Sequence, residues 1–150
     1  MPEKSGGHVP DAVRVGVYRR VRTDQARLDL FVTSQPHWKI VQKFTDNDSG
    51  RRADRPGLRN AMRSAGAGRI DVLLVDHTSD LSPVFPVLVR LLCELDQAGV
   101  AVRSVSEPFD TATPMGRMML TFMESLVQWE REAKARQKND EATLRGGDRG

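Results

Sequence analysis

The stretch that decides the fold is Asp110–Lys138, which reads DTATPMGRMMLTFMESLVQWEREAKARQK. Thr113 offers a side-chain oxygen for a helix N-cap, and Pro114 follows at the first helical position, where a missing N–H costs nothing. Apolar side chains then recur at spacings of three and four residues, at Met115, Met118, Met119, Phe122, Leu126 and Trp129. This periodicity predicts one long helix over 113–138.

The apolar surface of this predicted helix is wider than the single face described above. Leu120, Met123 and Val127 lie outside that face and extend it. A helix that is apolar over so much of its circumference buries more than one side. We therefore expect its first half to pack both on its own domain and on a partner. The alternative is an ordinary C-terminal helix that only closes the core. After Trp129 most residues are charged, which predicts a second half that projects into solvent or onto a ligand.

Upstream of this helix, strand-like and helix-like segments alternate along the chain. The predicted strands span 12–21, 38–44, 70–75 and 100–105. The predicted helices span 23–33, 58–65 and 84–98. The segment IDVLLV at 70–75 is almost continuously apolar, which indicates a strand covered on both faces. Such alternation predicts βαβ units with right-handed crossovers and thus an α/β fold with a largely parallel sheet.

Length and composition are typical of one ordinary folded domain. The 150 residues are 39% hydrophobic and 29% charged, with a net charge of +3 that gives only a mild preference for polyanionic partners. We expect a flexible leader over 1–11, one domain over 12–138 and a flexible tail over 139–150. No segment has the composition of a secretory signal or of a membrane span. The single cysteine, Cys93, has no internal partner, and a cytoplasmic protein is the default expectation.

In parallel sheets, functional residues gather in the loops at the carboxyl ends of the strands. Here those loops are 20–24, 46–56, 76–83 and 106–113, and they hold many of the Arg, Asp and Ser residues. The histidines His8, His37 and His77 lack metal-ligand spacing, so no metal site is expected. Neither a phosphate-binding loop nor a dinucleotide fingerprint occurs, so no cofactor is expected.

Read in order, short motifs in these loops resemble the catalytic domain of the serine recombinases, the resolvase and invertase family. The motifs are Tyr18–Val21, Phe44–Asp46, Ser49-Gly50, Asp54–Leu58, Asp71–Val75, Asp110–Met119 and Glu130–Glu132. The resemblance covers nearly the whole chain. It implies a three-layer resolvase-like domain with a mostly parallel sheet of four to five strands and a long C-terminal helix. It also implies a helix-turn-helix module after this domain, and the sequence stops at Gly150 before one.

The family's reaction is phosphoryl transfer on DNA. A serine attacks a DNA phosphate and forms a covalent link, while clustered arginines stabilise the charge on the phosphate oxygens. The resemblance places the nucleophile directly after the Tyr-x-Arg-Val motif, and this sequence has Arg22 there. A guanidinium has no acceptor atom and keeps its charge, so Arg22 cannot be the attacking group.

A second departure follows the third predicted strand, where the family carries Leu-Asp-Arg-Leu and a further Arg two residues on. Here Ser79 and Asp80 take the Asp and Arg places, and Pro83 takes the place of the second Arg. A carboxylate in place of a phosphate-binding cation repels the substrate. The family residues that remain are Arg20, Asp46 and Arg55, with the Ser49-Gly50 turn.

These departures leave three hypotheses open. The first is a dimer associated with DNA that has lost strand cleavage, with Arg20, Arg22 and Arg55 forming a cationic pocket able to hold a phosphate. In this hypothesis it can also pair with an active recombinase through the helix interface. The second is an active recombinase that uses Thr23 or Ser79 as nucleophile. The third is a protein-interaction module without a role on DNA.

The resemblance also assigns partners to the long helix. It implies a homodimer through Met115, Met118, Met119, Phe122, Met123, Leu126 and Trp129. In the family the same helix reaches along the DNA minor groove, which nominates Arg117, Arg131, Lys134, Arg136 and Lys138 as phosphate contacts. Neighbouring acidic residues, among them Glu130 and Glu132, dilute this charge.

Overall fold

A computed structural model describes residues 12–47 and 55–147 of the chain. Its elements are β1 Val13–Arg20, α1 Gln25–Thr33, β2 Trp38–Asp46, α2 Pro56–Gly66, β3 Val72–Val75, the 3-10 helix η1 Thr78–Asp80, α3 Phe85–Gln97, β4 Ala101–Ser104 and α4 Pro114–Gly147. The predicted order of strands and helices is confirmed, with ends that differ by a few residues. The predicted leader and the Ser49-Gly50 turn lie outside the described residues.

The sheet of the described residues has four strands in the order β2-β1-β3-β4, and all neighbouring strands run parallel. All residues of β3 are buried, as expected for a central strand covered on both faces. Because the strands are parallel, the segments that follow β1, β2 and β3 emerge at one edge of the sheet. This arrangement brings distant parts of the sequence into one place.

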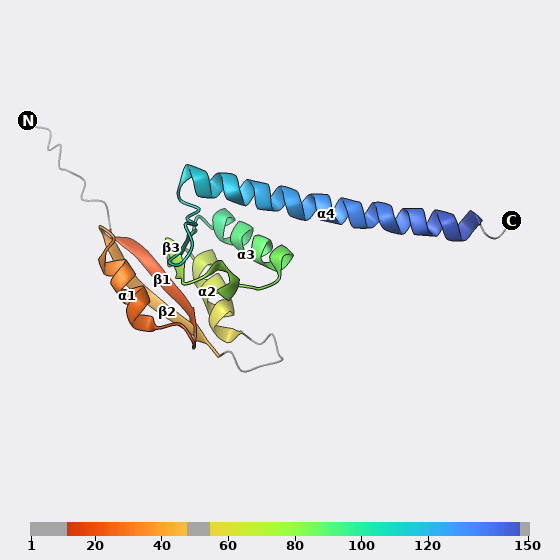
Figure 1. Ribbon diagram of the computed structural model, residues 1–150. Helices are drawn as coiled ribbons and strands as arrows, with labels where there is room; N and C mark the ends of the chain where they lie inside the picture. Colours follow the sequence, from red (N-terminus) through yellow and green to blue (C-terminus); the bar gives the residue numbers. More distant parts are fainter. Residues whose placement is uncertain (1–11, 48–54, 148–150) are drawn as a thin grey trace, which may run out of the picture.

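Helices cover both faces of the sheet and give the expected three layers (Figure 1). On one face, Leu28 and Val32 of α1 pack against Val15 and Val17 of β1. The other face holds the larger core, which α2 and α3 cover and to which α4 contributes Leu120. The α/β fold class predicted from the sequence is confirmed.

The long helix α4 begins as the sequence predicts. The Thr113 hydroxyl accepts a hydrogen bond from the Gly116 N–H at 3.0 Å, which is an N-cap interaction. Gly116 also allows a close approach of the preceding loop, since a Cβ there would lie 1.7 Å from the Asp110 carbonyl oxygen. The start of α4 is therefore locked onto the segment that enters it.

The predicted end of this helix at Lys138 was wrong, whereas the predicted flexibility of residues 139–150 stays a prediction. Helix α4 continues to Gly147. The segment after Lys138 contains Glu141, Ala142 and Leu144, which favour helix, and no proline or glycine interrupts it before Gly146. The distal part of α4 extends away from the domain body (Figure 1).

Helix α4 shows two apolar sides with different surroundings. Leu120 and Val127 are 3% and 8% exposed, and Met123 is partly buried against the larger core. A neighbouring side of the helix leaves six large apolar residues exposed on this chain: Met115, Met118, Met119, Phe122, Leu126 and Trp129. The predicted packing on the domain itself is therefore present, and a second apolar side is left uncovered within the chain. Among the described residues, none of the helices is both long and apolar enough to cross a bilayer.

Candidate functional site

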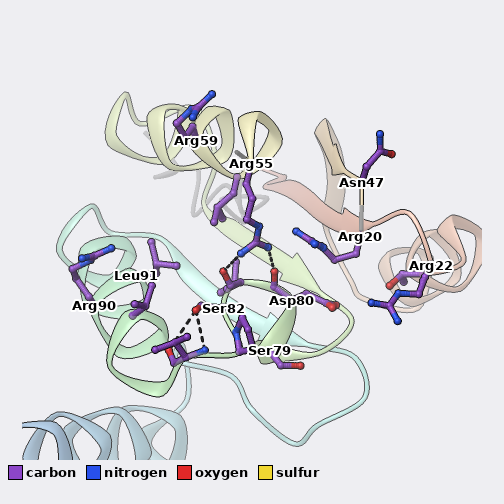
Figure 2. Close-up of a pocket in the computed structure, with 16 residues that line it drawn as sticks. Arg20, Arg22, Asn47, Arg55, Arg59, Ser79, Asp80, Ser82, Arg90 and Leu91 are labelled. Carbon is purple, nitrogen blue, oxygen red and sulfur yellow. Dashed lines mark hydrogen bonds between the residues drawn. The ribbon is translucent and has the colours of Figure 1, made fainter. Parts of the chain in front are cut away.

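A pocket of about 840 Å³ lies at the edge of the sheet where β1 and β2 end (Figure 2). It is lined by Arg20, Arg22, Thr23, Asn47, Arg55, Leu58, Arg59, Ser79, Asp80, Leu81, Ser82, Pro83, Val84, Val87, Arg90 and Leu91. These residues come from the segments after β1 and β2, from α2, from η1 and the loop behind it, and from α3. Parallel strand order thus assembles the pocket from three separate stretches of the chain, 20–23, 47–59 and 79–91.

Positive charge is concentrated in this pocket. Its lining contains five arginines and one aspartate, which gives a formal charge of +4. The whole chain carries only +3. Guanidinium groups match phosphate oxygens in geometry and charge, so this lining is chemically suited to a phosphate ester.

The segment after β1 supplies one side of the pocket. Arg20 is the last residue of β1, and Arg22 and Thr23 follow in the turn before α1. The turn is held by a hydrogen bond from the Thr23 N–H to the Arg20 carbonyl oxygen at 2.9 Å. Arg22 therefore occupies the pocket at the position where the resemblance implies a nucleophile, and its side chain offers donors only.

Arg55 binds the protein itself with much of its guanidinium. Its Nη2 donates to the Tyr18 hydroxyl at 2.6 Å and to the carbonyl oxygen of Asp80, and its Nη1 donates to the carbonyl oxygen of Leu81. The guanidinium carbon also lies 5.4 Å from the centre of the Tyr18 ring. Arg55 lines the pocket and at the same time fastens η1 and the residue after it to β1.

Asp46 lies beneath the pocket and organises it. The buried carboxylate accepts hydrogen bonds from the Tyr18 hydroxyl at 2.8 Å and from the N–H groups of Gly57 and Leu58 at 2.7 and 2.9 Å. Those N–H groups belong to the first turn of α2, where a negative charge is favourable. Burial raises the pKa of Tyr18, and its hydrogen bond to Asp46 acts in the same direction. Asp46 thus joins β1 and β2 to the start of α2, and its predicted catalytic role stays a prediction.

The η1 turn places Ser79 and Asp80 at the pocket. Asp80 accepts a hydrogen bond from the His77 N–H at 3.1 Å, which closes the turn. Burial raises the pKa of Asp80, and the hydrogen bond from His77 opposes that shift. Ser79 is exposed and adds a hydroxyl to the lining. The carboxylate of Asp80 is the only negative charge among the lining residues that the structure describes.

Five of the six residues predicted as catalytic thus meet in one pocket, and the sixth, Asp46, supports it from below. Sequence reasoning missed Arg59 and Arg90, which line the pocket from α2 and α3. Arg59 follows Arg55 by four residues, one helical turn, which was a usable signal. Arg90 had no such signal, because only the packing of α3 against α2 brings it near.

The structure also shows a small cluster of potential metal-ligating groups that the sequence did not predict. Ligand atoms of Asp76, His77 and Asp80 lie within 4.8 Å of one another. The His77 Nδ1 is 3.2 Å from an Asp76 oxygen, and the other Asp76 oxygen accepts a hydrogen bond from the Ser106 hydroxyl at 2.6 Å. Hydrogen bonds and the ion pair account for this grouping, and the predicted absence of a metal site stays a prediction.

The α4 residues predicted to contact DNA are not part of the pocket lining. Arg117 pairs with Asp96 of α3 through two contacts, at 2.8 and 3.3 Å, and so ties α4 to the domain. Lys134 pairs with Glu130 at 3.3 Å on the same helix. The side chains of Arg131, Lys134, Arg136 and Lys138 are exposed. Their role as DNA contacts stays a prediction.

Known proteins are similar to this chain over most of its length. The family described as "Resolvase, N terminal domain" matches residues 18–147. Serine recombinase Gin of Escherichia phage Mu is 36% identical over 115 residues, which cover 77% of this chain and 58% of Gin. Transposon Tn3 resolvase of Escherichia coli is 32% identical over 139 residues, covering 89% of this chain and 74% of that resolvase.

Solved structures share the fold. The N-terminal catalytic domain of TP901-1 integrase superposes with a TM-score of 0.71 at 23% identity, covering 80% of this chain and 98% of that domain. A resolvase family recombinase from Streptococcus pneumoniae also gives a TM-score of 0.71, at 17% identity, over 89% of this chain and 98% of that chain. The architecture is that of a recombinase catalytic domain. The chain belongs to the resolvase and invertase family of serine recombinases.

Proposed function

We propose that this protein is a DNA-associated dimer that has lost strand cleavage. The observation that carries the proposal is the composition of the pocket, which keeps a strong positive charge while its nucleophile position holds Arg22. The chain spans 58% of the length of Gin, so what Gin does as a whole protein enters here only as support for the proposal. A role on DNA agrees with the cytoplasmic location expected from the single cysteine.

The lining charge supports contact with DNA phosphates. A formal charge of +4 in one pocket attracts a polyanion, and a guanidinium group matches phosphate oxygens in geometry and charge. Distal α4 adds exposed lysines and arginines outside the pocket, interspersed with acidic residues such as Glu130 and Glu132. Binding through such contacts releases counterions from the DNA, so its affinity should fall as salt rises.

Two features of the pocket oppose cleavage. Arg22 has no oxygen or sulfur that could attack phosphorus, and a permanent cation gives up no proton at neutral pH. Asp80 and Pro83 stand where the family resemblance implies arginines, which removes two charges from the stabilisation of a phosphoryl transition state. Nucleophile and stabilising charges act together, so the loss of both leaves little activity.

The uncovered apolar side of α4 supports a dimer. Met118, Phe122 and Trp129 are each more than three-fifths exposed, and contiguous apolar residues of this size are unfavourable in water. A second copy offers the same helix side and would cover it symmetrically. The same face would also accept an active recombinase subunit, giving a mixed dimer with one cleavage-deficient subunit.

The test combines DNA binding with a search for a covalent adduct. We expect the protein to bind a short mixed-sequence duplex in low salt, with affinity that falls steeply over a salt series. After denaturation in detergent, no covalent protein–DNA product should remain. Absence of binding at low salt would reject the DNA role and favour a protein-interaction module.

One observation favours a second candidate, an active recombinase with another nucleophile. Thr23 and Ser79 both line the arginine pocket and carry hydroxyl groups. If either acts, a covalent adduct forms with the unaltered protein and disappears in Thr23→Val or Ser79→Ala. An adduct that persists in both variants would exclude these two hydroxyls.

A further inference from the structure

The pocket has two cationic sides that differ in what surrounds them. Figure 2 shows Arg20 and Arg22 on one side and Arg59 and Arg90 on the opposite side, with Arg55 between them. A single phosphate group needs only one or two arginines for full coordination. The pocket volume of about 840 Å³ lies toward the upper end of the roughly 300–1,000 Å³ typical of small-molecule sites. The hollow is thus larger and more divided than one phosphate requires.

The side that carries Arg59 and Arg90 is also the apolar side. Its lining includes Leu58 from α2 and Leu91 from α3, with Val84 and Val87 at the start of α3. Val84 is 54% exposed, so an apolar surface is open to the pocket. Arg90 contacts Glu94 at 3.9 Å, a weak pair between exposed side chains that leaves the guanidinium able to reorient.

A lining that is both cationic and apolar suits a nucleotide better than it suits a lone phosphate group. A nucleotide has a charged group at one end and a flat, weakly polar base at the other. Proteins that hold single strands combine a positive groove with side chains, usually aromatic, against which bases lie; here the aliphatic side chains of the lining would take that place. In a duplex the bases are paired and stacked, so a hollow of this kind receives a base only from an unpaired or extruded nucleotide.

We propose that the side of the pocket formed by α2 and α3 receives an unpaired nucleotide of a DNA strand. Its base rests against Val84 and Val87 and its phosphate lies at Arg59 and Arg90, while the neighbouring phosphate lies at Arg20 and Arg22. This inference rests on the DNA role proposed above and narrows it to a substrate class. It makes Arg59 and Arg90 DNA ligands and predicts a preference for single-stranded over duplex DNA.

The first experiment compares three probes with the unaltered protein in low salt: an oligothymidylate, a duplex of equal strand length, and an abasic strand that carries the same phosphates. We expect the oligothymidylate to bind about tenfold more tightly than either other probe, since base contacts typically change affinity by that order. The abasic strand keeps the charge and lacks the bases, so it isolates their contribution.

Two matched pairs of variants locate the contact. Val84→Ser should bring the affinity for oligothymidylate down to that for the abasic strand, whereas Val41→Ser, at an exposed valine of β2, should change neither. Arg90→Gln should weaken both single strands and flatten the salt dependence, whereas Arg69→Gln, just after α2, should not. Serine at position 84 suits the N-cap of α3 and preserves the fold.

The outcomes separate the two proposals. No binding of any probe at low salt rejects the DNA role itself. Binding in which the duplex equals or exceeds the oligothymidylate, or in which the abasic strand binds as well as oligothymidylate, overturns the unpaired-nucleotide site and leaves the DNA role in place. Unchanged binding in both Val84→Ser and Arg90→Gln overturns the assignment to this side of the pocket.

Discussion

Arg22 and Asp80 set the chemical character of the pocket at the scale of single residues. Arg22 replaces the implied nucleophile with a group that only donates hydrogen bonds. Asp80 adds a carboxylate to a lining that otherwise carries only positive charge among the residues the structure describes. The first change removes the attacking atom that the resemblance implies at this position, and the second adds a charge that repels a phosphate group.

Replacing Asp80 should strengthen DNA binding. Asp80→Asn removes the negative charge from the lining, so we expect roughly fivefold tighter binding near neutral pH, equivalent to about 1 kcal/mol. The pKa of Asp80 is raised by burial, so in the unaltered protein this carboxylate takes up its proton at higher pH than an ordinary aspartate. Its negative charge is present above that pKa and lost as pH falls through it.

Affinity titrations as a function of pH check this expectation. As pH falls, the gap between the unaltered protein and Asp80→Asn should close, because both then carry a neutral side chain at this position. Asp29→Asn, on α1 outside the pocket lining, serves as the control. A gap that is absent at neutral pH, or that widens as pH falls, would contradict the assignment.

Cys93 should be an unreactive thiol in the folded protein. Burial raises its pKa to about 11, and Glu124 adds to the shift. Because the thiolate is the reactive form, alkylation at pH 8 should be roughly a hundredfold slower than in denaturant. Mass spectrometry after timed iodoacetamide treatment measures this directly, since the chain has one cysteine. Equal rates in both conditions would be inconsistent with the raised pKa.

At the scale of elements, helix α4 contributes both to the core of the domain and to a surface available for association. Its first half has one side in the domain core and another side uncovered within the chain. Its second half projects beyond the domain and carries alternating charges (Figure 1). One element therefore serves folding through one face and is available for association through another.

Gly116 is required at the start of this helix. A Cβ at that position would lie 1.7 Å from the Asp110 carbonyl oxygen, so Gly116→Ala forces the loop and helix apart. We expect a loss of about 1–3 kcal/mol in the free energy of unfolding, measured by urea denaturation. Gly146→Ala is the matched control, because a Cβ there meets nothing within 4 Å. Similar losses for both variants would show that the close approach is not the cause.

The two sides of α4 should respond differently to substitution. Met118→Glu with Leu126→Glu places charges on the exposed side, so we expect a monomer of nearly unchanged stability. Leu120→Ala removes a core side chain, so we expect a loss of about 2–5 kcal/mol in the free energy of unfolding. Sedimentation and urea denaturation separate the two effects. An unaltered protein that stays monomeric at high micromolar concentration and forms no mixed dimer with an active recombinase would reject the proposed interface.

The pocket is a property of the whole molecule, since β1, β2, α2, η1 and α3 must all be in place to form it. Tyr18, Asp46 and Arg55 connect these parts through a continuous chain of hydrogen bonds. Arg55 in turn holds the carbonyl groups of Asp80 and Leu81, which fixes the η1 side. The cationic surface is therefore held together by Tyr18 together with Asp46 and Arg55, the two that the family resemblance implies as site residues.

Restoring cleavage should require changes on two sides of the pocket together. Arg22→Ser supplies a nucleophile and leaves the missing charges unrepaired, so we expect no covalent adduct from this variant alone. Adding Ser79→Asp, Asp80→Arg and Pro83→Arg restores the side chains that the resemblance implies, and a serine-linked DNA adduct should then appear on a denaturing gel. An adduct from Arg22→Ser alone would show that the remaining arginines are sufficient.

Local patterns in the sequence determined the α/β class, the order of the elements and the start of α4. Alternating and helical periodicities report which side of a segment is buried, and Thr113-Pro114 marks a helix start by local chemistry. The same patterns misplaced the end of α4, because charged residues at an exposed helix end resemble a tail. The two departures at Arg22 and Asp80 were visible directly, since they depend on residue identity alone.

Only the tertiary structure decided which side chains share a site and what each contacts there. Arg59 and Arg90 joined the pocket because α2 and α3 pack side by side on one face of the sheet. The structure shows that Arg55 donates hydrogen bonds to backbone carbonyl groups. It also shows that the buried Asp46 carboxylate accepts a hydrogen bond from the first turn of α2. Periodicity in the sequence fixes which face of an element is buried. The distances between elements arise from the packing of the whole core, so no single stretch of sequence determines them.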